Sequence, residues 1–148
     1  MSEHRATIEW VRKGEFKYET YSRQHVWRFD GGISVPGNAA PANIPRTVPP
    51  APGVDPEQAF VASLSSCHML WFLHLACNRK FVIERYVDEA TGVLDQDWMS
   101  QVTLRPRVTF SGKAPSAEEH RALHEKAHER CFIANSVKTE VRVAPTIG

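Results

Sequence analysis

The sequence predicts one α+β domain, and three observations support this fold class. Short strand-like segments fill the first third of the chain, a long apolar helix follows a proline-rich stretch, and further strands flank a second helix. Because strands and helices are grouped rather than strictly alternating, a doubly wound α/β fold is disfavoured. The length of 148 residues is enough to bury one core but not two independent ones, so the predicted domain spans residues 1–148.

The first third of the chain predicts an antiparallel meander. Apolar and polar residues alternate over residues 6–11, and two further strand-like segments cover residues 16–21 and 25–29. The turn sequence Asp30-Gly31-Gly32 then leads into a strand over residues 33–35. These segments are short and closely spaced, so neighbouring strands are expected to pair.

The stretch from Pro36 to Pro56 contains seven of the ten prolines. Proline has no backbone N–H and a fixed φ, so this stretch is expected to be neither a central strand nor a helix. We expect a loop, and its length suggests a lid or an arm that reaches a partner subunit.

The signals for a helix start are clear at Asp55. Asp55 is the expected N-cap, Pro56 suits the first helical position, and Gln58 is placed to close a capping box. Neither glycine nor proline interrupts residues 59–77, and apolar residues occupy nearly every side. The helix is therefore predicted to be buried on most faces, at the centre of the fold or at a subunit interface.

The second half predicts two strands, a helix and a last strand. The strands cover residues 81–91 and 98–110 with a turn at 92–97, and Pro106 places the second strand at an edge or a bulge. A capping box at Ser116 to Glu119 opens a helix that runs to about Cys131. Alternation over residues 137–143 predicts a half-buried final strand.

Composition excludes several classes of function. A net charge of +1 gives no electrostatic reason to expect a nucleic-acid or anionic-membrane partner. The N-terminus lacks the apolar core of a signal peptide, which favours a cytoplasmic protein. Three cysteines, Cys67, Cys77 and Cys131, are too few for a disulfide framework and contain no CxxC pair.

Cys67 lies in the apolar helix, and a buried cysteine is most often a small apolar side chain. It lies about three turns from the helix N-terminus, too far for the helix dipole to stabilise a thiolate much. A reactive thiolate at this position therefore needs a cation from elsewhere in the chain.

The run Asp55-Pro-Glu-Gln-Ala-Phe-Val-Ala-Ser-Leu-Ser-Ser-Cys67 resembles the helix motif of the OsmC/Ohr family of peroxide-reducing proteins. In that family a Pro-Glu pair precedes the reactive cysteine by about three helical turns, and a second cysteine follows on a later helix. The resemblance implies an OsmC-like fold, with antiparallel sheets around a central buried helix in an intertwined homodimer.

The resemblance also implies a role for four residues. The peroxidatic cysteine falls on Cys67, the resolving cysteine on Cys131, and the glutamate that holds the catalytic arginine on Glu57. The arginine comes from the N-terminal strands, where Arg23 is the best-placed candidate and Arg28 is the alternative. The implied reductant is an external dithiol such as dihydrolipoamide, with no bound cofactor or metal.

The chemistry fits these roles. A guanidinium would stabilise the Cys67 thiolate and polarise the peroxide, and a carboxylate would fix the guanidinium by bidentate pairing. Ten residues of helix separate Glu57 from Cys67 by about 15 Å, so one arginine cannot easily touch both within a subunit. We therefore expect Arg23 and Glu57 of one subunit to complete the site around Cys67 of the other.

Three alternatives remain open from the sequence. One is a non-catalytic relative that binds a small apolar ligand at the dimer interface. Another is a zinc hydrolase, because His124-Glu125-Lys126-Ala127-His128 fits the HExxH pattern. The third concerns His68 and His74, which would either tune a nearby pKa or be satisfied by backbone groups. Cys77 is expected to be a core or semi-buried thiol.

Overall fold

The computed structural model describes all of residues 1–148, which form two compact units, Met1–Ala59 and Phe60–Gly148. A long helix, α1 (Pro56–Asn78), begins in the first unit and continues through the second. The expectation of one domain over the whole chain stays a prediction.

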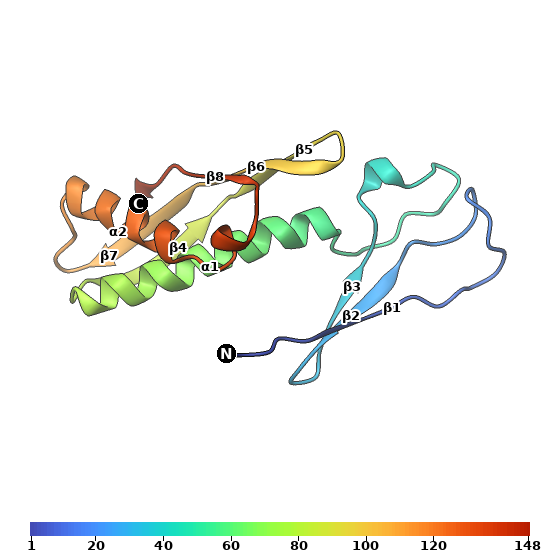
Figure 1. Cartoon of the computed structure of the whole chain (residues 1–148), viewed down its shortest axis with the longest axis horizontal. Helices are drawn as coiled ribbons and strands as arrows, with labels where there is room; N and C mark the ends of the chain where they lie inside the picture. Colours follow the sequence, from blue (N-terminus) through green and yellow to red (C-terminus); the bar gives the residue numbers. More distant parts are fainter. The chain divides into compact units, whose positions relative to one another are not determined.

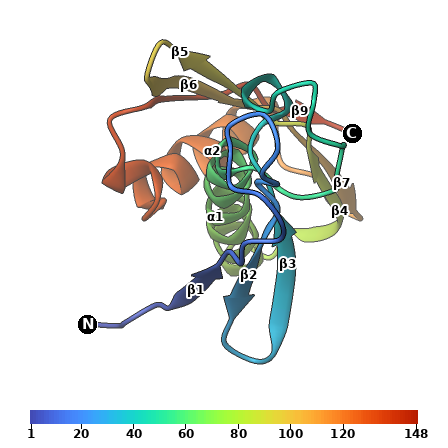
Figure 2. The same cartoon turned by 90° about the vertical axis from the view of Figure 1, so that its right-hand side faces the viewer.

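The first unit contains a three-stranded antiparallel sheet in the order β1-β2-β3 (Figures 1 and 2). The strands are β1 (Ala6–Glu9), β2 (His25–Phe29) and β3 (Ile33–Gly37). The turn predicted at Gly31 and Gly32 is confirmed, since both adopt the left-handed φ that glycine allows, at +81° and +79°.

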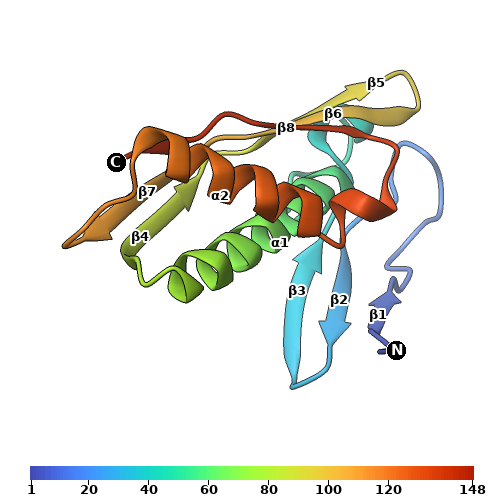
Figure 3. The same ribbon diagram turned by 60° about the vertical axis from the view of Figure 1, so that its left-hand side comes forward.

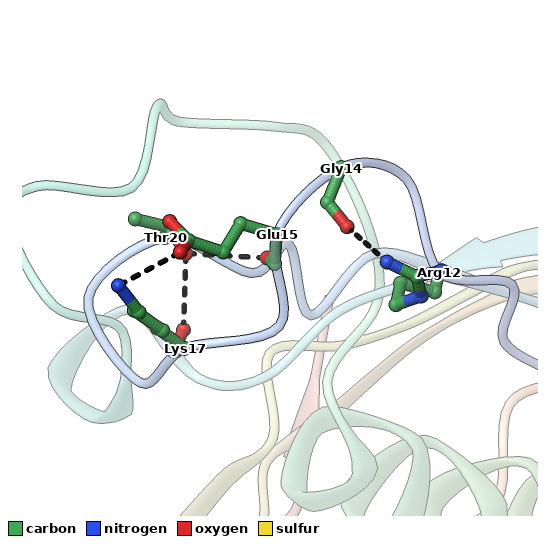
Figure 4. A network of polar contacts seen from close by, with 5 residues as sticks. All are labelled: Arg12, Gly14, Glu15, Lys17 and Thr20. Carbon is green, nitrogen blue, oxygen red and sulfur yellow. Dashed lines mark hydrogen bonds and ion pairs between the residues drawn. The ribbon is translucent and has the colours of Figure 1, made fainter.

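The strand predicted over residues 16–21 is wrong, because this segment is part of the loop between β1 and β2. Its backbone forms a turn in which the N–H groups of Thr20 and Tyr21 both donate to the Lys17 carbonyl. Local polar contacts stabilise the loop (Figure 4): Arg12 Nη1 donates to the Gly14 carbonyl at 2.8 Å, and Thr20 Oγ1 donates to the Glu15 carbonyl at 3.2 Å. The loop therefore satisfies its own backbone instead of pairing with a strand.

The proline-rich stretch is a loop, as predicted, and it is tied to β3. Val54 N–H donates to the Pro36 carbonyl at 2.8 Å, and Asn38 N–H donates to the Val54 carbonyl at 3.1 Å. The buried Asn38 side chain donates to the Ala51 carbonyl at 3.0 Å. A short 3-10 helix, η1 (Pro41–Asn43), lies between these ties.

The second unit contains two three-stranded sheets, in the orders β4-β7-β9 and β5-β6-β8. The elements after α1 are β4 (Val82–Asp88), β5 (Thr91–Asp95), β6 (Trp98–Leu104), β7 (Pro106–Ser111), α2 (Ala117–Arg130), η2 (Ala134–Ser136), β8 (Glu140–Val143) and β9 (Thr146–Ile147).

The sequence predicted two strands where four are present. A tight turn at Gln96, with φ at +56°, makes a hairpin of β5 and β6. Asp88 Oδ1 accepts the Arg105 N–H at 2.6 Å, and Pro106 has no N–H to donate. The strand partner therefore changes at this point, since β6 pairs with β5 and β7 pairs with β4. The strands β8 and β9 pair in parallel with β6 and β7, so the sheets are mixed rather than wholly antiparallel.

Both predicted helix starts are confirmed. Gln58 N–H donates to Asp55 Oδ1 at 2.7 Å and Asp55 N–H donates to Gln58 Oε1 at 3.2 Å, which is the expected capping box. The same reciprocal pair joins Ser116 and Glu119 at the start of α2.

Within the second unit α2 packs along α1, and both contact the sheets (Figure 3). The core cluster joins Phe72 and Ala76 of α1 to Leu123 and Ala127 of α2. In the single chain α1 buries one stripe at every fourth residue: Leu64, His68, Phe72 and Ala76. The predicted burial on most faces, at the fold centre or at a subunit interface, stays a prediction. The other apolar side chains of α1 lie partly or fully exposed in this chain.

Candidate active site

The two predicted redox cysteines lie together in the second unit. Cys67 is half-buried on α1, and Cys131, at the C-terminal cap of α2, is 1% exposed. Both are free thiols, and Cys67 lies close enough to Cys131 to contribute to the raised pKa of Cys131. Residues that are 64 positions apart in the sequence are thus brought into contact because α2 ends beside α1.

The surroundings of the two sulfurs differ. Burial, with a further contribution from the neighbouring Cys67 thiol, raises the pKa of Cys131 to about 11. Its sulfur also accepts the Ala134 N–H at 3.4 Å. Cys131 therefore keeps its proton at neutral pH.

The residues Arg23 and Glu57 line one cavity in the first unit, with a volume of about 410 Å³. We call this cavity the arginine pocket. Aromatic side chains from the loop between β1 and β2 form much of its wall, and Pro56 and Glu57 at the start of α1 close it. The lining residues are Trp10, Phe16, Tyr21, Arg23, His25, Asn38, Ala39, Ala40, Asn43, Pro56 and Glu57.

The Arg23 guanidinium is held by backbone carbonyls. Nη1 donates to the Tyr21 carbonyl at 2.6 Å and Nη2 donates to the Tyr18 carbonyl at 2.9 Å. The guanidinium also lies over the Tyr21 ring, 3.6 Å from its centre, an arrangement that favours a cation. The arginine is therefore fixed in position before any ligand arrives.

The expected ion pair between Arg23 and Glu57 is not formed in this chain. Glu57 Oε2 is buried without a hydrogen-bond partner, although it belongs to the same cavity as the guanidinium. A buried carboxylate oxygen without a partner is costly, so this pocket offers an acceptor for a donor that enters it.

Of the two arginine candidates, Arg28 is held elsewhere. Its Nη2 pairs with Glu9 Oε1 at 3.2 Å across β1 and β2, with both side chains about half exposed. Arg28 does not line the arginine pocket. Arg23 is thus the arginine that shares a site with Glu57.

The HExxH histidines do not form a metal centre. No group of three or more His, Cys, Asp or Glu side chains is arranged to hold a metal ion. His124 instead stacks on Phe72 with ring centres 4.1 Å apart, and its Nδ1 is hydrogen-bonded to His68 Nε2 at 2.9 Å. The pattern arises from a buried histidine cluster between the helices, which removes the geometric basis of the zinc-hydrolase alternative.

This cluster contains His68, His120, His124 and His128. Burial is the main cause that lowers the pKa of His68 to about 4 and that of His124 to about 3. Burial also lowers the pKa of His120. One alternative expected backbone groups to satisfy His68. Its Nε2 is hydrogen-bonded to His124 Nδ1 instead.

Two flanking residues lie at the surface. Cys77 is exposed, so the expectation of a core or semi-buried thiol is wrong. His74 contacts the Asn78 side chain at 3.1 Å on the exposed last turns of α1.

His25 and Trp27, whose side chains meet beside the arginine pocket, were not predicted as functional residues. Trp27 Nε1 donates to His25 Nε2 at 2.7 Å. The two residues stand two positions apart on β2, which places them on the same face of the sheet. In the sequence, this spacing of two residues was the only signal that the His25 and Trp27 side chains lie together.

The fold and the two close thiols define a class: an α+β protein with a two-cysteine site between a long apolar helix and a later helix. The family model for OsmC-like proteins matches residues 49–146. The chain belongs to this family, as the motif around Cys67 predicted, and the expected α+β, OsmC-like fold is confirmed.

Several solved structures share this fold. An OsmC-like protein of unknown function from Vibrio cholerae is 43% identical, with a TM-score of 0.90 over 99% of this chain and 100% of that one. An organic hydroperoxide resistance protein from Legionella pneumophila is 18% identical, with a TM-score of 0.64 over 100% of this chain and 98% of that one. OhrB, an organic hydroperoxide resistance protein of Bacillus subtilis, is 20% identical, with a TM-score of 0.60 over 97% and 98%. No curated protein matches the chain.

Helix α1 passes the length and composition test for a membrane span, a test that core helices of soluble proteins also pass. Only 22% of its apolar window is buried in the single chain.

Proposed function

We propose that the protein is a thiol-dependent peroxidase that reduces organic hydroperoxides, with Cys67 as the attacking and Cys131 as the resolving cysteine. The observation that carries the proposal is the contact between two free thiols of unequal burial in a chain of the OsmC-like family. Hydrogen peroxide is a second, smaller substrate of the same chemistry.

The reaction is balanced in three steps. The Cys67 thiolate attacks the outer oxygen of ROOH, the O–O bond breaks, and protonation of the leaving alkoxide gives an alcohol and Cys67–SOH. The Cys131 sulfur then attacks the sulfenic sulfur, a disulfide forms, and the lost hydroxide takes the Cys131 proton to leave as water. An external dithiol, of the dihydrolipoamide type, finally reduces the disulfide and is itself oxidised.

The unequal burial of the thiols suits these roles. A resolving cysteine must stay protonated and unreactive until the sulfenic acid forms, and the raised pKa of Cys131 provides this. The half-buried Cys67 is the more accessible of the two to a peroxide.

We further propose that the active form is a homodimer in which Arg23 and Glu57 of one subunit complete the site of the other. An 18-residue stretch of α1 is apolar enough to cross a membrane, yet only 22% of it is buried in the single chain. Leu70 is 60% exposed and Phe132 is 68% exposed. Apolar surface on this scale is typical of an interface, and a second copy would cover it.

The test is hydroperoxide consumption by the purified protein with a dithiol. Cumene and tert-butyl hydroperoxide are compared with hydrogen peroxide for the parent, Cys67→Ser, Cys131→Ser and Cys77→Ser. We expect Cys67→Ser to abolish turnover and Cys131→Ser to stop it after one sulfenic acid forms. Cys77→Ser is the matched control, because this thiol is exposed and should leave the rate unchanged.

Equal consumption by the parent and Cys67→Ser would refute the peroxidase. The aromatic wall of the arginine pocket would then favour the second candidate function, binding of a small apolar ligand without catalysis. Sedimentation of the parent tests the dimer: a stable, active monomer would contradict the shared site.

The proposed setting is the cytoplasm. A functional disulfide in that compartment is transient and is reopened by a reductant, as the reaction cycle requires.

A further inference from the structure

The side chains of Trp27 and His25 form a chain of two hydrogen bonds that ends at the backbone carbonyl of Arg23. We call this chain of hydrogen bonds the relay. Trp27 Nε1 donates to His25 Nε2 at 2.7 Å, and His25 Nδ1 lies 2.7 Å from the Arg23 carbonyl oxygen. The indole N–H is only ever a donor, so His25 Nε2 must be the acceptor. The proton of the neutral imidazole is therefore on Nδ1, which donates to the Arg23 carbonyl.

This relay fixes the near end of the Arg23 side chain. The far end is fixed separately, because the two carbonyls of Tyr18 and Tyr21 accept from the guanidinium. With the backbone held by His25 and the guanidinium held by the tyrosine carbonyls, the intervening torsions have little freedom. His25 itself lines the arginine pocket beside Arg23 and Glu57.

The neighbouring strand leaves space for this relay. Gly37 of β3 pairs with His25 of β2, and a β carbon added to Gly37 would clash with His25 Nε2 and Trp27 Nε1. Any larger residue at this position would force one of the two rings to shift. The relay therefore depends on the pairing of β2 with β3 and on the small size of Gly37, which together leave room for the His25 and Trp27 rings.

We propose that His25 is a positioning residue, which acts through its hydrogen bond to the Arg23 carbonyl to keep the guanidinium aimed into the arginine pocket. This inference rests on the role proposed for Arg23 in peroxide reduction. It assigns to His25 no contact with the peroxide and no proton transfer.

Two replacements of His25 test its two hydrogen bonds separately: the bond of Nδ1 to the Arg23 carbonyl and the bond of Nε2 to Trp27. Asparagine places a side-chain N–H where Nδ1 lies and so keeps the donor to Arg23. Glutamine places its polar group where Nε2 lies and so keeps only the partner of Trp27. We expect His25→Ala and His25→Gln to slow peroxide reduction about tenfold to a hundredfold, because a displaced catalytic group costs this much. His25→Asn should restore most of the rate.

A double-mutant cycle shows whether His25 acts through Arg23. If it does, His25→Ala has no further effect in the Arg23→Ala background, because there is no guanidinium left to position. A purely structural role would slow both backgrounds equally. Equal losses in the two backgrounds, or a His25→Gln variant faster than His25→Asn, would overturn the inference.

A second measurement does not depend on activity. Nitrogen-15 NMR of the arginine side chains reports how freely each guanidinium rotates, and Arg23→Ala assigns the Arg23 signal. We expect restricted rotation of Arg23 in the parent and His25→Asn, and faster rotation in His25→Ala, where the two tyrosine carbonyls alone hold the guanidinium. If the parent consumes no hydroperoxide, the proposed function fails, and the NMR result alone decides on the relay; free rotation in the parent would overturn it.

Discussion

Acid should destabilise the fold through the buried pair of His68 and His124, which links α1 to α2. Both histidines have a folded pKa below the ordinary value of 6.5, so the folded state resists protonation that the unfolded state accepts. Stability is therefore complete above the unfolded pKa and falls as pH drops from 6.5 towards the folded values of about 4 and about 3.

The size of this effect follows from the pKa of His68. Proton linkage with a shift from 6.5 to about 4 gives a loss of about 2 kcal/mol between about pH 7.5 and pH 5 from His68 alone. His68→Gln keeps a polar group near the position of Nε2 but does not titrate. The variant should therefore lose about 2 kcal/mol less than the parent over this range.

The assay is urea unfolding at the two pH values, at one protein concentration, for the parent and His68→Gln. His74→Gln is the matched control, since His74 is exposed, lies outside the buried histidine pair and should keep the pH dependence of the parent. The same pH dependence in the parent and His68→Gln would refute the assignment of the lowered pKa to burial in the helix interface.

The remaining predictions concern the arginine pocket, the core and the helix cap. Arg23→Gln should slow hydroperoxide reduction about a hundredfold, and Arg28→Gln should not slow it; the opposite order would reverse the assignment of the two arginines. Gly37→Ala should reproduce the slower reduction of His25→Ala by displacing the His25 and Trp27 rings, and an unchanged rate would contradict that packing. Phe72→Ala should cost about 3–5 kcal/mol in urea unfolding, because this side chain is fully buried between α1 and α2. Asp55→Ala should cost about 1 kcal/mol through loss of the α1 cap, and no change would show that the capping box is not stabilising.

Features set by local chemistry were predictable from the sequence. The capping boxes at Asp55 and Ser116, the turn at Gly31 and Gly32 and the length of α2 depend on neighbouring residues, and the structure has all of them. The motif that ends at Cys67 was specific enough to give the family.

Features set by distant partners were not predictable. The segment over residues 16–21 has the alternation of a strand but no strand to pair with, and it closes on itself as a turn. Asp88 separates β6 from β7 by accepting the Arg105 N–H, a contact that no local pattern indicates. The HExxH pattern left the zinc-hydrolase alternative open, because the spacing of His124 and His128 does not show whether a third ligand is near. It also does not show that His124 bonds to His68 on another helix.

The candidate site follows the same division. Cys67, Cys131, Glu57 and the preference for Arg23 came from the sequence, whereas the pocket that Arg23 shares with Glu57, and the pairing of Arg28 with Glu9, are visible only in the structure. The relay through His25 depends on Gly37 of the next strand, so only the paired sheet reveals it.

The central claim is that Cys67 and Cys131 form the catalytic disulfide, and peptide mapping by mass spectrometry tests it most directly. Purified protein is treated with one equivalent of cumene hydroperoxide, the remaining thiols are alkylated, and the digest is compared with that of untreated protein. The account predicts one new linkage, between the Cys67 and Cys131 peptides, with Cys77 still alkylated. Alkylation of all three cysteines after the hydroperoxide is consumed, or a linkage that includes Cys77, would contradict it.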